Sequence, residues 1–230
     1  MKNKSEYIKF ILPLLIIFFW FIFTYTGKVP PTSLPSLSAV KDTFMEMLKS
    51  GQLSNDLSLS LRRVLAGFFI SSILGISLGI FMGISSKAKE FFQLTLTAIR
   101  QIPMIAWIPL IILWTDIGEV SKIVVILFAA TFPIVVNTMG GVDSTSETYL
   151  EVAKMYGLSK KDTFFKVYLP SALPNIFTGL RLGLSSSWMA VVASELIASS
   201  SGIGYRLNDA RSLMRSDVVI VCMIVIGLIG

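Results

Sequence analysis

The chain has 230 residues, of which 53% are hydrophobic and only 15% are charged, and its formal net charge is +6. A soluble domain carries about a quarter of its residues as charged side chains, so the shortage of charge excludes an ordinary water-exposed surface and predicts a membrane protein. The basic residues lie in the short polar gaps between apolar runs, where membrane proteins keep them, and form no nucleic-acid stripe.

The chain also lacks the residues of histidine-based catalytic and metal sites. It has no histidine, and its one cysteine, Cys222, lies within an apolar run. A disulfide framework is therefore excluded, and the commonest metal ligand and general base are missing. We expect no catalytic residues, no metal site and no nucleic-acid partner.

The first apolar run covers residues 8–25, close to the length of about 20 residues that crosses the hydrocarbon core as a helix. Lys2, Lys4 and Lys9 flank its start, as they would in a secretory signal peptide. However, the run is bulky and aromatic, and no small-x-small cleavage pattern follows it. We therefore interpret it as an uncleaved span.

A polar connection follows in residues 27–56, and its three prolines exclude one continuous helix. After Ser36, a suitable N-cap, apolar side chains recur at helical spacing up to Gly51. This pattern predicts a short amphipathic helix that lies at the membrane interface or packs on the bundle.

Four more apolar runs of spanning length lie near residues 62–85, 91–114, 120–138 and 172–198. In the first of them Gly75, Gly79 and Gly83 recur every fourth residue, which predicts a face where another helix packs closely. Pro103 and Pro109 interrupt the next run. Such prolines free carbonyl groups that neighbours or a water-filled cavity must satisfy, so both are candidates for a translocation path or gate.

A sixth run, residues 218–230, has about 13 residues and is too short to cross the core. We expect the natural chain to continue beyond it and to complete the span. Lys and Arg residues are divided about equally between the two sides of this arrangement, so the positive-inside rule does not orient it.

The polar segment between the fourth and fifth spans carries a specific motif. It reads Glu151-Val152-Ala153, three residues, Gly157, nine residues, then Val167-Tyr-Leu169-Pro170. This pattern resembles the cytoplasmic loop of the binding-protein-dependent ABC importer permeases, E-A-A, three residues, G, nine residues, I-x-L-P. Val152 and Val167 are conservative departures.

The motif also has physical requirements. We expect Glu151, Val152 and Ala153 to begin a short helix that enters a groove on a partner, and Gly157 to end it by accepting positive φ. Leu169 and Pro170 are expected to terminate the following segment before the fifth span. With Tyr149, these residues are the predicted ATPase-coupling residues.

Other segments resemble the branch of this family that serves sulfonates, taurine, nitrate and thiamine-precursor pyrimidines. They are residues 59–68, 102–110, 137–142, 179–183, 193–197 and 202–205. One departure is Asp116, where the branch usually has glycine, and it bears on the tight turn between the third and fourth spans.

The resemblance implies an all-α polytopic bundle of six transmembrane helices, the type I ABC importer permease fold, in a bacterial cytoplasmic (inner) membrane with both termini cytoplasmic. Residues 58–230 would form the permease domain, with the coupling loop at 141–171. Residues 1–57 would hold the first span and an extracytoplasmic amphipathic connection.

The resemblance also implies partners. The permease would form a homodimer in membrane lipid, each copy would dock a cytoplasmic ATP-binding-cassette ATPase subunit, and an extracytoplasmic substrate-binding protein would deliver the solute. The chain itself would be no enzyme and would bind no cofactor, because ATP and Mg²⁺ would bind to the ATPase. The alternative is a membrane channel or assembly subunit without ATP coupling.

Two charges lie within the fifth span, Arg181 and Glu195. They are about four helical turns apart, roughly 21 Å, so they share a face but cannot pair directly. They either line a path for an anionic substrate or gate it, or they are interfacial charges near the two ends of the span. Gly179 and Gly183 of the same run are predicted helix-packing positions.

Overall fold

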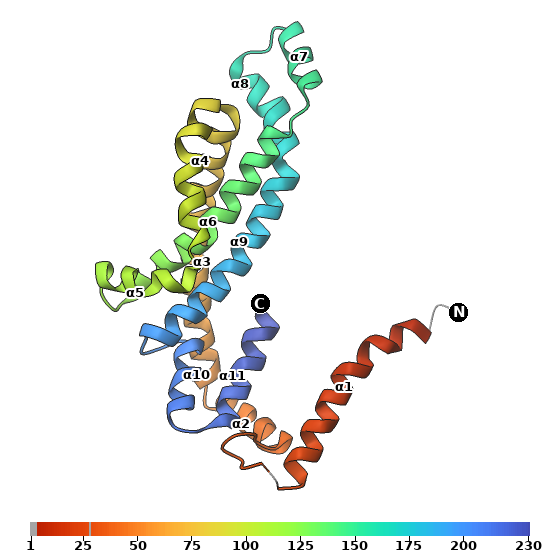
Figure 1. Cartoon of the computed structure of the whole chain (residues 1–230), viewed down its shortest axis with the longest axis vertical. Coiled ribbons are helices and arrows are strands. Elements are labelled where there is room, and N and C mark those ends of the chain that lie inside the picture. The colour runs from red at the N-terminus through yellow and green to blue at the C-terminus, as the bar shows by residue number, and fades with distance from the viewer. Residues whose placement is uncertain (1–3, 28) are drawn as a thin grey trace. The chain divides into compact units, whose positions relative to one another are not determined.

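The structure, a computed structural model, describes residues 4–27 and 29–230, and all regular secondary structure in these residues is helical (Figure 1). The all-α prediction is confirmed. The chain divides into two compact units, residues 1–58 with 201–230, and residues 59–200.

The first unit contains α1 (Lys4–Tyr25), α2 (Leu37–Lys49), α10 (Ile203–Ser212) and α11 (Ser216–Ile229). Ser36 caps α2 by accepting a hydrogen bond from the Ala39 backbone, and Gly51 follows the helix with φ +75°. The short amphipathic helix predicted from the sequence is therefore present. It packs against α11, and the Thr43 hydroxyl donates a 2.7 Å hydrogen bond to Asp217.

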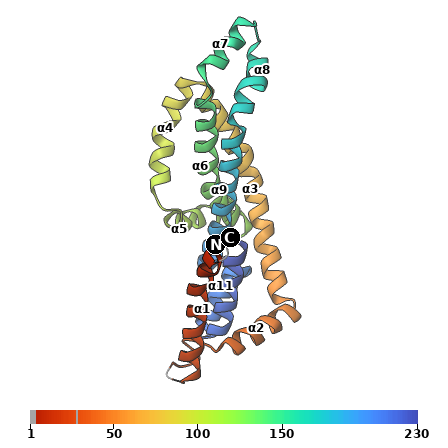
Figure 2. The same ribbon diagram turned by 90° about the vertical axis from the view of Figure 1, so that its right-hand side faces the viewer.

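The second unit contains most of α3 (Gln52–Ile84) and all of α4 (Ser86–Gln101), α5 (Met104–Thr115) and α6 (Glu119–Asp143). The short helices α7 (Glu147–Met155) and α8 (Lys160–Thr163) follow, then a π-helical turn, η1 (Phe164–Tyr168), and α9 (Leu169–Ala198). Helices α6 and α9 lie side by side and antiparallel along their length, and α3 runs alongside them (Figures 1 and 2).

Glycines set the close approach of these three helices. A Cβ added at Gly79 of α3 would lie 2.6 Å from Cβ of Thr138 and 2.8 Å from the Val135 carbonyl oxygen, both on α6. Gly75 and Gly83 meet Ile134 and Val142 in the same way, which shows that α3 and α6 pack in one continuous register. Helix α9 makes the same kind of approach to α6 through Gly179 and Gly183.

The third predicted span, residues 91–114, is not one helix. It is broken into α4 and α5, whose axes differ by 99°. The break falls at Ile102 and Pro103, because a residue before proline is pushed out of helical conformation, and Ile102 adopts φ −79°, ψ 121°. Pro109, in contrast, lies inside α5.

Among the described residues, four helices are long and apolar enough to cross a membrane, or five if the bent pair is one span. These are α1, α3, α6 and the continuous helix Lys160–Ala198. Helix α11 is apolar but shorter. The arrangement is compatible with the predicted six-span bundle without reproducing its count.

The turn between α5 and α6 forms in spite of its departure from the family pattern. Asp116 occupies it with φ +61° and ψ 173°, a region that is essentially reserved for glycine. The backbone therefore keeps the conformation that a glycine would adopt there, and the aspartate bears the strain.

Candidate functional site

The predicted coupling loop is a helical hairpin whose first helix, α7, begins earlier than expected. It starts at Glu147, not at Glu151. An acidic first residue after Ser146 suits a helix N-terminus, because it faces the positive end of the helix dipole. Tyr149 therefore lies within α7, one turn before Ala153 on the chain.

Gly157 ends this helix. It has φ +67°, its N–H donates to the Lys154 carbonyl, and the N–H of Leu158 donates to the Ala153 carbonyl, both at 3.0 Å. These two bonds form a Schellman motif, in which a left-handed glycine satisfies the last carbonyls of the helix. The open space around Gly157 shows that backbone conformation, not lack of room, requires glycine there.

Leu169 and Pro170 do not terminate a segment, contrary to the expectation from the sequence. The helix runs without interruption through α8, η1 and α9. The wider π-helical turn, closed by the Leu169 N–H donating to the Phe164 carbonyl, precedes Pro170 and accommodates its missing N–H at the start of α9. The loop is thus joined directly to a long helix.

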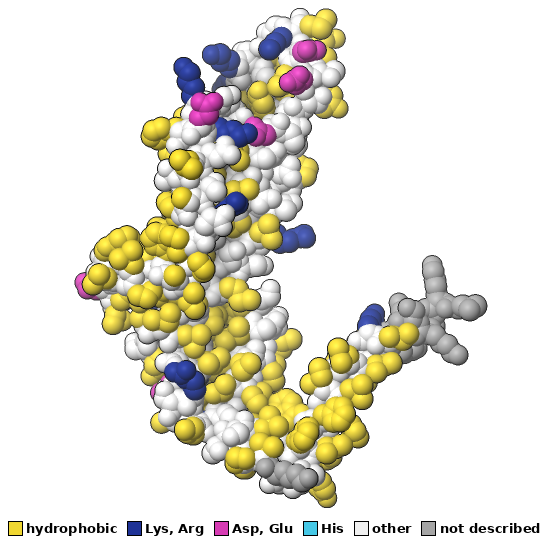
Figure 3. All heavy atoms as spheres, viewed as in Figure 1, with side chains coloured by type: hydrophobic (Ala, Val, Ile, Leu, Met, Phe, Trp, Pro, Cys, Tyr) yellow, Lys and Arg dark blue, Asp and Glu magenta, His cyan; other side chains and the backbone are white. Residues whose placement is uncertain are grey.

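The hairpin exposes apolar side chains at a place where a loop should be polar. Met155 is 85% exposed and Tyr156 81%, and Tyr149 and Val152 are also exposed, whereas Ala153 is buried. A groove of about 500 Å³ lies between α7 and the start of the α8–α9 helix, lined by apolar groups and by Lys166. In Figure 3 charged side chains gather at this end of the unit, around the apolar ones.

A buried charge cluster lies near the opposite ends of α6 and α9. Glu195 is 1% exposed, and its carboxylate accepts hydrogen bonds from Arg63 Nη1 at 2.6 Å and from the Ser60 hydroxyl at 2.8 and 2.9 Å. Arg63 Nε also donates to Glu119 at 2.7 Å. Glu195 is therefore a buried charge that joins α3, α6 and α9.

Arg181 has a different environment from Glu195. Its side chain is exposed, and it forms no ion pair with any side chain that the structure describes. The sequence missed Arg63 as the partner of Glu195, because the two residues lie on different helices and no local pattern connects them. The one available signal was that a carboxylate within a span needs a cationic partner.

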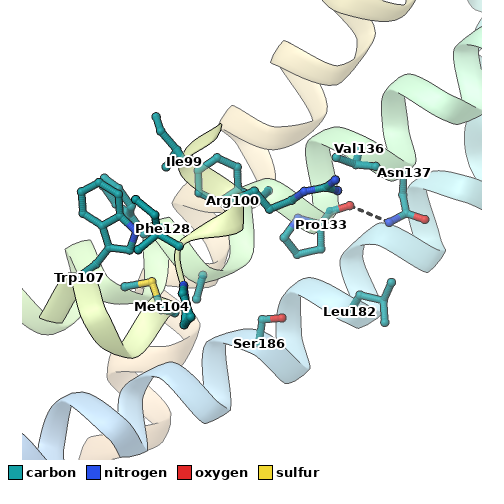
Figure 4. Close-up of a pocket in the computed structure, with 14 residues that line it drawn as sticks. Ile99, Arg100, Met104, Trp107, Phe128, Pro133, Val136, Asn137, Leu182 and Ser186 are labelled. Atoms are coloured by element: carbon teal, nitrogen blue, oxygen red, sulfur yellow. Dashed lines mark hydrogen bonds between the residues drawn. The ribbon is translucent and has the colours of Figure 1, made fainter. Parts of the chain in front are cut away.

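An open cavity of about 400 Å³ lies where the α4–α5 break meets α6 and α9 (Figure 4). Pro103 lines it, whereas Pro109 and Arg181 do not. Its polar side chains are Arg100, Asn137 and Ser186. Sequence reasoning did not single out Arg100. No group of three or more His, Cys, Asp or Glu side chains suited to a metal ion occurs in residues 4–27 and 29–230.

Comparison with known proteins decides the class. Residues 71–230 match the family model described as binding-protein-dependent transport system inner membrane component. A putative ABC transporter permease protein of Methanocaldococcus jannaschii is 38% identical over the whole chain and 87% of its own length. The chain belongs to this family of permeases. A putative aliphatic sulfonates transport permease protein of Bacillus subtilis is 36% identical over 96% of the chain and 80% of its own length.

A solved structure supports the fold of this permease. The crystal structure of an amino acid ABC transporter with histidines matches 81% of the chain and 91% of its own, with a TM-score of 0.65 and 15% identity. At that identity the likeness shows the fold alone.

Family membership has direct consequences. The chain is the membrane-spanning permease subunit of an ABC importer, a multi-pass protein of the inner membrane, and a transport component and not an enzyme. Such a permease works with an ATPase and a substrate-binding protein. A channel without ATP coupling is not favoured.

Proposed function

We propose that this permease carries a small anionic nutrient, of the sulfonate kind, across the inner membrane as a homodimer coupled through residues 141–171 to an ATPase. The similarity to a permease named for aliphatic sulfonates supports the solute class. The chain also resembles the wider branch of the family, so taurine, nitrate and thiamine-precursor pyrimidines are the competing solutes.

The exposed apolar face of α7 is the observation that carries the coupling proposal. Its exposed side chains are Tyr149, Val152, Met155 and Tyr156, and apolar patches of this kind mark protein interaction sites. The ATPase covers this face. It also binds the ATP and Mg²⁺, so that the permease itself binds no cofactor.

The continuous helix explains how a movement of the loop reaches the membrane. Because α8, η1 and α9 form one rod from Lys160 to Ala198, displacement of α7 by the closing ATPase tilts α9. Helix α9 is packed along α6 through Gly179 and Gly183, so that the walls of the cavity between these helices move with it.

The same assignment orients the chain. The coupling loop must face the cytoplasm to meet an ATPase, and in a six-span bundle it follows four crossings. The N-terminus then lies on the cytoplasmic side too, and two further crossings return the C-terminus to that side.

Replacing the glycine that ends α7 tests the coupling. Gly157→Arg should abolish solute uptake into membrane vesicles and the ATPase stimulation caused by the loaded binding protein, because the residue must adopt φ +67° to end the helix. Gly27→Arg is a matched control, since Gly27 also has φ +67° and open space around it. A Gly157→Arg variant that transports normally would refute the coupling role.

Solute class is tested by uptake in cells that carry the complete transporter. Labelled ethanesulfonate and taurine should accumulate in an ATP-dependent way, ahead of nitrate and of an uncharged aminopyrimidine. Preferred uptake of the pyrimidine would contradict the anion assignment and leave the coupling proposal unaffected.

A further inference from the structure

Arg100 is a cation with no charged partner among the described residues. It lies in the last turn of α4, within the bent pair of helices that together are long and apolar enough to span. It is exposed and makes no ion pair or side-chain hydrogen bond with any described residue. By contrast, Arg63 is held by two carboxylates, and Lys122 donates to the Gly118 carbonyl at 2.9 Å. An ionisable residue in such a place is kept for function.

Arg100 faces two cavities at once. It lines the cavity of about 400 Å³ at the α4–α5 break and a smaller one of about 120 Å³, and Phe132 and Val136 line both. No acidic side chain lines either cavity. Inside these two cavities the guanidinium therefore meets no carboxylate among the described residues and is available to an anion that enters.

The larger cavity also offers polar and aromatic groups suited to a particular ligand. In Figure 4 the Arg100 side chain points toward Pro133 and Asn137, while Trp107, Phe128 and Met104 form an apolar wall on the other side. Asn137 Nδ2 donates to the Pro133 carbonyl at 2.8 Å, which fixes the amide and leaves its second N–H for a ligand. The volume lies within the usual range of small-molecule sites.

We propose that this cavity binds a small organic anion, with the anionic head held by Arg100 and Asn137 and the carbon chain packed against Trp107 and Phe128. A planar guanidinium offers parallel N–H donors that match two oxygens of a sulfonate or carboxylate. An alkyl chain can pack against the aromatic wall, whereas an inorganic anion has no apolar part to make this contact. This inference rests on the proposed anion import and adds the residues that select the solute.

Direct binding tests the site. The purified full-length permease in lipid nanodiscs is titrated calorimetrically with ethanesulfonate, propionate and nitrate, and with tetramethylammonium as a cation. Ethanesulfonate should bind and tetramethylammonium should not. Nitrate should bind more weakly than ethanesulfonate, and the ratio of ethanesulfonate to propionate affinity shows which head group the site prefers.

Variants locate the site. Arg100→Met should weaken ethanesulfonate binding by about tenfold to a hundredfold, the range expected for hydrogen bonds to a charged group. Arg100→Lys keeps the charge but loses the planar pair of N–H donors, so its affinity for ethanesulfonate should lie between that of Arg100→Met and that of the parent. Arg62→Met, on an exposed arginine of α3 outside both cavities, is the matched control and should bind as the parent does.

Three results would overturn the inference: no ethanesulfonate binding by the parent protein, equal binding by Arg100→Met, or loss of binding in Arg181→Met but not in Arg100→Met. Thermal unfolding of each variant separates lost binding from lost fold. ATPase stimulation of the parent transporter by the loaded binding protein is measured in parallel. Normal stimulation without anion binding refutes this site alone, whereas binding without stimulation refutes the coupling proposal alone.

Discussion

Two regions of residues 59–200 differ in what they bury: one buries charged side chains, and the other exposes apolar ones. Near the start of α6 and the end of α9, Arg63 and Glu195 are buried, and each has its partner within the chain. At the proposed coupling loop, apolar side chains such as Met155 and Tyr156 are exposed among charged ones. A buried charge that is paired within the chain holds helices together. An exposed apolar surface that the chain does not cover indicates a contact with another protein.

The largest expected effect comes from breaking the buried ion pair. Arg63→Met leaves the carboxylate of Glu195 buried without its guanidinium, and removal of one partner of a buried pair costs about 3–5 kcal/mol. Denaturant unfolding in detergent measures this loss. Arg62→Met, a change at the exposed neighbour, should alter stability little.

A double variant sharpens this prediction. Arg63→Met combined with Glu195→Leu should recover much of the lost stability, because neither variant position then leaves a buried charge without its partner. If the single Arg63 variant is as stable as the Arg62 variant, the pair does not hold the three helices together.

The helices that connect the two regions give the next effect. Gly79→Ala would place a Cβ 2.6 Å from Thr138 and against the backbone of Val135, and such overpacking costs about 1–3 kcal/mol. Thermal unfolding of the purified permease measures it. Gly140→Ala on α6 is the matched control, since a Cβ there meets nothing within 4 Å. Equal stability of the two variants would contradict the close α3–α6 packing.

The exposed region should respond in the opposite sense. Met155→Ser removes an apolar side chain that is 85% exposed, so the free energy of unfolding should change by less than about 0.5 kcal/mol. Association with the ATPase should weaken by about 1–2 kcal/mol, roughly tenfold. Co-purification and surface plasmon resonance measure the second quantity. If Met155→Ser lowers the free energy of unfolding but leaves ATPase binding unchanged, this side chain stabilises the fold and does not bind the partner.

The smallest effect is expected at the α5–α6 turn. Asp116→Gly removes the strain of φ +61° and should stabilise the permease by about 1 kcal/mol. Asp116→Ala removes the charge but keeps a Cβ, so it should bring no such gain. A gain in both variants would show that charge, not backbone strain, limits stability at this turn.

The sequence by itself determined the class of protein and the local features of its fold, such as helix ends and packing faces. Shortage of charge and the length of the apolar runs indicated a helical membrane protein, because lipid contact needs no polar cover. The spacing of Glu151, Gly157 and Pro170 located the proposed coupling loop, and the glycines of α3 marked a packing face. These features are local, since capping, helical periodicity and small side chains act within a few residues.

The tertiary structure alone decided the rest. It paired Arg63 with Glu195 across 132 positions of the chain. It also showed that the helix is broken at Pro103 but continues through Pro170. It also placed Arg100 beside Asn137 in a cavity. The physical reason is the same in each case: a charge or a freed carbonyl must find its partner in space, and periodicity does not record which helix supplies it.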